Sequence, residues 1–222
     1  MRIHTRQLAI GFTAALMLAF AVSAAPARNL SVSNQNLRVV WNPLTFNGEG
    51  LVEARCRVTL EGSFHYTTIV KRERALIGLI TRAIIPVHPC ERENAWIYNG
   101  TERNELLGNT TLTNSLPWHL TYESFRGTLP NITSINVLLD GARFLLRSSG
   151  LGALCNYTTG ATHGGNATGI ATIGAGGVVT GLTAEEGRRI RSETAFCPEG
   201  RFSGTGRVTL LGTENTITIR LI

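Results

Sequence analysis

The stretch CRVTLEGSFHY, residues 56–66, decides the fold, because its apolar side chains recur at every second position. The apolar set comprises Cys56, Val58, Leu60, Phe64 and Tyr66. The polar side chains between them, Glu61 and His65 among them, fall on the other side. A period of two is typical of a β-strand with one face buried and the other in water. We therefore expect a half-buried strand here.

The same alternation or short apolar runs recur along the rest of the chain, separated by glycine-containing turn signals. They predict strands at 37–41, 76–85, 118–122, 132–139, 143–147, 207–211 and 216–221. Asp140-Gly141, between two of these runs, predicts a tight hairpin. No apolar residues repeat at helical spacing. The sequence therefore predicts an all-β fold, either an antiparallel β-sandwich or a partly closed β-barrel.

A glycine-rich segment at 160–187 interrupts this pattern. A structureless loop of that length is uncommon inside a compact domain. We therefore expect short strands within it, at 170–173 and 178–180.

The first 24 residues have the order of a secretory signal peptide. A short basic stretch precedes an apolar run at 8–22, and small residues follow at 22–24. We predict cleavage after Ala24, with Ala25 and Ala27 as alternatives, which leaves residues 25–222 as a single secreted β-rich domain. An uncleaved membrane anchor is the other interpretation of this segment. We expect no transmembrane segment in the mature form.

The four cysteines, Cys56, Cys90, Cys155 and Cys197, all lie after this segment. An even count in an exported chain predicts two disulfides, with three connectivities open. If 55–70 and 76–91 form a hairpin, Cys56 and Cys90 lie opposite each other. That geometry favours the pairs Cys56–Cys90 and Cys155–Cys197.

Catalytic and cofactor signatures are missing from the sequence. There is no G-x-S-x-G or H-E-x-x-H motif, and His65, His88, His119 and His163 lack the short spacing of metal ligands. We predict no catalytic residue, no metal and no cofactor. Glu53, Glu61 and Glu123 fall on expected strands, where a glycosidase pair is conceivable.

Cleavage after Ala24 removes two of the 21 basic residues and lowers the formal net charge from +6 to +4, which is mild for the remaining 198 residues. The dense basic clusters, at 71–74 and 188–191, are each flanked by acidic residues. Nucleic-acid binding requires a basic face with interleaved aromatic residues, so we expect no nucleic-acid partner.

Trp96 and Tyr98 lie among polar residues in what we expect to be a loop. They are the candidates for a surface contact with cell-wall or extracellular carbohydrate, or with a protein. Trp118 and Tyr122 alternate with polar residues, which favours burial instead.

Four segments carry a resemblance: CRVTLEGSFHYTTIVK at 56–71, LPWHLTYESFRGTLPNITSI at 116–135, GLGALCNY at 150–157 and GRVTLLG at 206–212. Together they resemble a group of small, uncharacterised exported actinobacterial proteins. The resemblance implies a bacterial, extracytoplasmic protein. It implies no activity and no site residue.

These observations favour an exported, non-enzymatic β-domain that serves as a cell-envelope or extracellular binding or structural module. A secreted hydrolase acting on carbohydrate or ester substrates is the first alternative. A small outer-membrane β-barrel, suggested by the alternation near the C-terminus, is the second.

Overall fold

The computed structural model describes residues 29–49, 52–86, 90, 96–99, 109–111, 115–128, 130–147, 154–160, 165–185 and 189–222. Within these ranges the chain forms fifteen β-strands and one short 3₁₀ turn, η1 (Ala175–Gly177). The predicted signal segment 1–24 lies outside the described residues.

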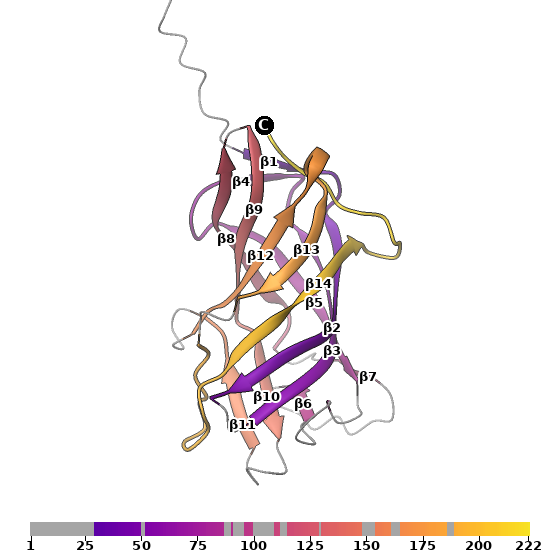
Figure 1. The fold of residues 1–222 in the computed structure, drawn as a ribbon. Helices are drawn as coiled ribbons and strands as arrows, with labels where there is room; N and C mark the ends of the chain where they lie inside the picture. The colour runs from indigo at the N-terminus through magenta and orange to yellow at the C-terminus, as the bar shows by residue number, and fades with distance from the viewer. Residues whose placement is uncertain are drawn as a thin grey trace, which may run out of the picture.

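Eight strands form a closed antiparallel barrel (Figure 1). They are β2 (Asn36–Gly48), β3 (Val52–Phe64), β5 (Leu76–Pro86), β8 (Trp118–Thr128), β9 (Asn131–Asp140), β12 (Ala167–Ile173), β13 (Val179–Ala184) and β14 (Arg201–Leu210). Each pairs with the next in this order, and β14 pairs back onto β2. The all-β prediction is confirmed, and the barrel is fully closed.

Two small sheets lie at opposite ends of the barrel, as Figure 1 shows. One contains β1 (Asn29–Val32), β4 (Thr68–Val70) and β15 (Ile219–Leu221). The other contains β6 (Trp96–Asn99), β10 (Arg143–Arg147) and β11 (Leu154–Thr158). A further short strand, β7 (Asn109–Thr111), pairs with β5.

The glycine-rich segment forms two strands, as its sequence predicts, and the structure places both in the barrel. β12 and β13 pair with each other around η1, and their outer edges pair with β9 and β14. The segment is therefore part of the barrel wall and not a loop beside it.

The prediction of a tight hairpin at Asp140-Gly141 is wrong, because the strands on either side of it do not pair with each other. β9 ends at Asp140, and the chain then leaves the barrel for the second small sheet, where β10 pairs with β11 and β6. Gly141 does take a left-handed conformation, with φ of 79°. The dipeptide thus marks a change of direction, but a local pattern does not specify which strand becomes the partner.

The barrel bends where β2 contains Asn42-Pro43. The pairing of β2 with β3 shifts between Trp41 and Leu44, because proline has no N–H to donate to the ladder. Across from it, Gly204 of β14 has φ of 131°, and a Cβ there would lie 2.9 Å from the Pro43 carbonyl oxygen. Only glycine fits this corner.

Both predicted disulfides are confirmed. Cys56 is joined to Cys90 with Cα atoms 4.7 Å apart, and Cys155 is joined to Cys197 with Cα atoms 5.7 Å apart. The first bond closes the β3–β5 hairpin, and the second ties β11 to the segment that leads into β14. Such bonds persist in oxidising compartments, which makes this an extracytoplasmic protein.

Replacing Cys155 and Cys197 together by alanine should lower the free energy of unfolding by about 4 kcal/mol, because their bond closes a 42-residue loop. Guanidinium unfolding of the variant and the wild type measures this difference. Recovery of a peptide joining Cys56 to Cys155 in a non-reducing digest of the wild type would contradict the pairing.

Candidate functional site

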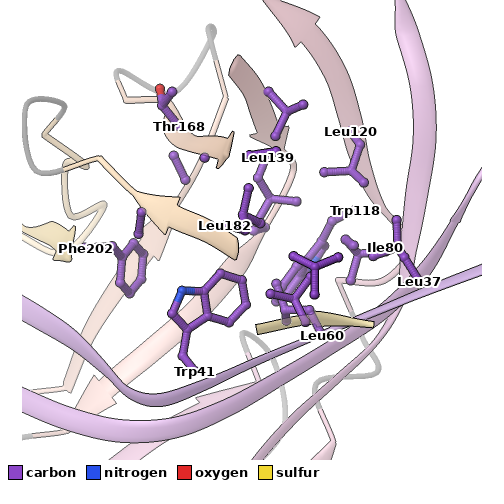
Figure 2. A pocket seen from close by; sticks show the side chains of 18 of the residues that line it. Leu37, Trp41, Leu60, Ile80, Trp118, Leu120, Leu139, Thr168, Leu182 and Phe202 are labelled. Carbon is purple, nitrogen blue, oxygen red and sulfur yellow. The ribbon is translucent and has the colours of Figure 1, made fainter. Parts of the chain in front are cut away.

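A cavity of about 180 Å³ lies inside the barrel, and almost all of its lining is apolar. Figure 2 shows the aromatic and aliphatic side chains that surround it. Its walls include Leu37, Trp41, Leu60, Ile80, Trp118 and Leu120. These residues point inward because they occupy alternate positions on their strands.

The cavity exists because one wall of the barrel carries little side-chain volume. On β12 the lining positions include Ala167, Gly169 and Ala171 beside Thr168, and on β13 one of them is Ala184. Protein interiors are normally packed to the density of organic crystals. A run of such small residues facing a wall of indole and branched side chains leaves the centre of the barrel unfilled.

One end of the cavity is covered by the sheet of β1, β4 and β15. Ile69 and Ile219 from this sheet, with the nearby Ile217, line the cavity and are at most 5 % exposed. In Figure 1, β1 and β4 lie across that end of the barrel.

Aromatic rings cover the other end of the cavity. Phe144 stacks on Tyr157 with centroids 5.2 Å apart, and Phe46 meets Tyr157 edge-on at 4.9 Å. Phe202 lies 5.2 Å from both phenylalanine rings. Phe144 and Phe202 also line the cavity. The cluster joins the second small sheet to the barrel.

Tyr157 is the member of this cluster with a polar group. Its hydroxyl donates to the Pro198 carbonyl oxygen at 2.8 Å, and its burial raises the pKa of the phenol to about 12. The folded protein therefore favours the neutral phenol over the phenolate.

Because the folded pKa of Tyr157 is raised, its stabilising contribution should be complete below pH 10 and lost between about pH 10 and pH 12. In Tyr157→Phe the free energy of unfolding should fall less steeply across that window. Tyr66→Phe is the matched control, because Tyr66 is 74 % exposed. Guanidinium unfolding from pH 8 to 12 measures the slopes, and equal slopes in the two variants would contradict the assignment.

The two indoles that line the cavity differ in their hydrogen bonding. Trp118 Nε1 donates to Ser115 Oγ at 2.9 Å. Trp41 is 4 % exposed, and its Nε1 has no acceptor among the described residues. An indole N–H can only donate, so Trp41 presents a donor without a protein acceptor in the described part of the chain.

Glu61 faces away from the cavity and lies between two arginines on the outer surface of the barrel. Arg38 of β2 and Arg82 of β5 pair with it in register, at 2.8 Å and 3.3 Å between charged atoms. Glu61 is only 7 % exposed, although the sequence places it on a wet face. The arginine side chains cover the carboxylate while they neutralise it.

Glu53 and Glu123 lie far from Glu61. Eight residues along β3 separate Glu53 from Glu61, or about 26 Å, and Glu53 pairs with Arg55 at 2.7 Å. On β8, Glu123 comes two residues after Thr121, which pairs with Leu76 of β5. Leu76 lies about 20 Å along β5 from Arg82, the residue that pairs with Glu61. A glycosidase pair lies within about 10 Å, so these carboxylates do not form one.

The histidines occupy separate places. His65 is half-buried in the turn after β3, whereas His119 is exposed on β8, opposite in direction to Trp118 and Leu120. His88 and His163 lie outside the described residues. Within the ranges that the structure describes, no group of three or more His, Cys, Asp or Glu side chains could hold a metal ion.

The sequence predicts a loop around Trp96 and Tyr98, but both residues lie in strand β6. Their backbone pairs with Arg147 and Leu145 of β10. The polar residues around Trp96 and Tyr98 in the sequence are typical of a loop, but polar residues also flank short strands at the edge of a sheet, such as β6. The positions of these two side chains lie outside what the structure describes, so their role in surface contact stays a prediction.

Comparisons with protein-family models, with curated proteins and with solved structures find no match. The described residues include no helix that is long and apolar enough to cross a membrane. The fold and the site therefore define the class of this protein by themselves: a closed, disulfide-bonded antiparallel β-barrel with an apolar central cavity.

Proposed function

We propose that this protein is an exported, non-enzymatic binding module that holds a small, apolar molecule inside its barrel. The observation that carries the proposal is the apolar cavity of about 180 Å³. An apolar cavity of roughly 150 Å³ is large enough to take up benzene. Eight-stranded barrels have an interior that can hold one small ligand.

The energetics of the cavity support a binding role over a purely structural one. An unfilled cavity costs about 24 cal/mol for each Å³ in a protein core. By that measure a cavity of about 180 Å³ lowers stability by roughly 4 kcal/mol. A molecule of matching shape recovers the lost contacts when it binds.

The apolar lining also narrows the chemistry of the ligand. Transfer of hydroxyl groups into an apolar site without hydrogen-bond partners is costly. A carbohydrate therefore does not suit the cavity. Contact with cell-wall carbohydrate or with a protein would involve the outer surface instead, for which Trp96 and Tyr98 remain the candidates.

The distribution of polar groups favours a barrel that works in water over the outer-membrane alternative. Leu37, Val39 and Trp41 of β2 point into the barrel, while Arg38 between them points out to Glu61. Membrane barrels have an apolar band outside and a polar interior. Export would follow cleavage of the predicted signal peptide near Ala24, and the two disulfides support a destination outside the cytoplasm.

Toluene binding tests the proposal. At ten times its dissociation constant, toluene should add about 1.4 kcal/mol to the free energy of unfolding of the wild type. Ala171→Leu should abolish this gain, because the larger side chain enters the cavity that Ala171 lines. Thermal or guanidinium unfolding with and without toluene measures the gain.

Thr172→Leu is the matched control, since Thr172 is the next residue on β12 and is exposed. It should keep the full toluene effect. A wild type that toluene does not stabilise, or equal loss in the two variants, would refute binding in the cavity.

A further inference from the structure

The outer surface at one end of the barrel combines exposed apolar side chains with basic ones. We propose that this surface, the cap end, docks on a membrane that contains anionic lipid. The cap end comprises the outer face of the β1–β4–β15 sheet, the turns at 65–67, 71–76 and 211–218, and the tip of the β8–β9 hairpin. It lies at the top of Figure 1. The inference goes beyond the proposed function, because it concerns the outside of the barrel and not the cavity.

Exposed apolar side chains gather at the cap end. Six large hydrophobic residues are exposed in the described part of the chain, and five of them belong to this end. The five are Tyr66, Val70, Leu76, Leu211 and Ile222. Single exposed residues of this kind are ordinary on a protein surface, but a group of them marks a contact with a membrane or with another protein.

Strand pairing places two of these residues in one row across the cap sheet. Asn29 of β1 lies opposite Val70 of β4 and exchanges backbone hydrogen bonds with Ile222. Val70 is exposed, whereas the preceding residue, Ile69, lines the cavity. Because side chains alternate between the two faces of a strand, the row from Val70 to Ile222 belongs to the outer face of the cap.

Tyr66 and Leu76 occupy the next positions at the end of the β3–β5 ladder. The last residue before Tyr66, His65, donates its backbone N–H to the Ile77 carbonyl oxygen at 2.9 Å. In an antiparallel ladder, Tyr66 and Leu76 are therefore the next opposite pair, and opposite residues share one face. Both side chains are exposed. They extend the apolar surface from the cap sheet towards the barrel wall.

Exposed arginines surround the apolar side chains. The Ala75 N–H donates to the Arg72 carbonyl oxygen at 2.9 Å, and this bond closes a tight turn that exposes Arg72 and Arg74. Arg220 is exposed on β15, and Arg126 is exposed on β8 near its hairpin tip. The turn and the cap sheet thus present positive charge beside the apolar group.

Positive charge exceeds negative charge at the cap end. Lys71 joins the four arginines as the fifth basic residue of this region. Three glutamates belong to the same part of the described chain, and one of them, Glu214, pairs with Arg207 at 2.8 Å. The other two are Glu73 and Glu123. The excess of basic residues complements anionic lipid headgroups, which attract each basic residue that comes near the surface.

The opposite end of the barrel contains a basic cluster that its neighbours neutralise. Arg189 contacts Glu49 at 2.9 Å and Glu199 at 3.4 Å, and Arg191 contacts Glu199 at 3.0 Å. Phe196, the sixth exposed hydrophobic residue, lies in the same segment, which is at the bottom of Figure 1. This end therefore offers arginines and an exposed aromatic residue as matched controls.

Docking at the cap end relates the surface to the cavity. Ile69 and Ile219 of the cap sheet line the cavity from the inner side. A docked cap therefore holds the covered end of the cavity next to a bilayer, in which apolar molecules dissolve.

Co-sedimentation of the mature protein, residues 25–222, with lipid vesicles tests the charge requirement. Vesicles of phosphatidylglycerol and phosphatidylcholine in equal parts should bind the wild type roughly tenfold or more tightly than vesicles of phosphatidylcholine alone. Arg72→Gln combined with Arg74→Gln should weaken binding to the anionic vesicles roughly thirtyfold, since each basic residue near such a surface contributes about fivefold.

Arg189→Gln combined with Arg191→Gln is the matched control, because it removes the same charge from the opposite end. The Debye length is about 8 Å at physiological salt, so charges at that end do not act on a bilayer at the cap. The control should bind the anionic vesicles like the wild type.

A second pair of variants tests the apolar requirement. Tyr66→Ser combined with Val70→Ser should weaken binding to the same vesicles roughly tenfold, because less apolar surface leaves water on docking. Phe196→Ser, the control at the opposite end, should not change it. All three side chains are exposed, so the substitutions leave the fold intact.

The outcomes decide between a bilayer and other partners. A wild type that does not bind the anionic vesicles, or equal losses in the cap-end variants and their controls, would overturn the proposal. Loss in the arginine variant without loss in the Tyr66 and Val70 variant would also overturn it, because that result indicates a polyanion and not a bilayer. Toluene binding in the cavity does not depend on these results, so the proposed function is tested separately.

Discussion

The backbone pairing of β14 with β2 is the interaction on which the rest of the structure depends. It joins the last strand of the barrel to the first, with Leu210 opposite Leu37 and Arg207 opposite Val40. Without it the sheet would have two open edges. With it, the number of strands fixes the diameter, and alternate side chains must share one enclosed interior.

The side chains that this closure encloses do not fill the interior. Trp41, Trp118 and Leu60 are large, but the strands built from the glycine-rich segment contribute residues such as Gly169 and Ala171. The two ends are covered by the β1–β4–β15 sheet and by the rings around Phe144. The cavity is thus a consequence of the closure of the barrel and of the small side chains on β12 together.

Most of the strands could be predicted from the sequence because alternation is a local property. The disulfide between Cys56 and Cys90 could also be predicted, because it requires only that β3 and β5 pair as a hairpin. The partner of the strand after Asp140 could not be predicted, because it depends on contacts with distant segments. The burial of Glu61 depends likewise on Arg38 and Arg82, which the register of three strands brings together.

The cavity could not be predicted from the sequence for a related reason. The glycine and alanine content of 160–187 was visible, but its consequence depends on which positions face inward and on what lies across the barrel. A crystal of the protein under xenon pressure tests the central claim most directly, because xenon enters apolar cavities. We predict a xenon atom inside the barrel, ringed by Trp41, Trp118 and Leu182; a barrel interior filled by side chains, with xenon absent or bound only elsewhere, would contradict the account.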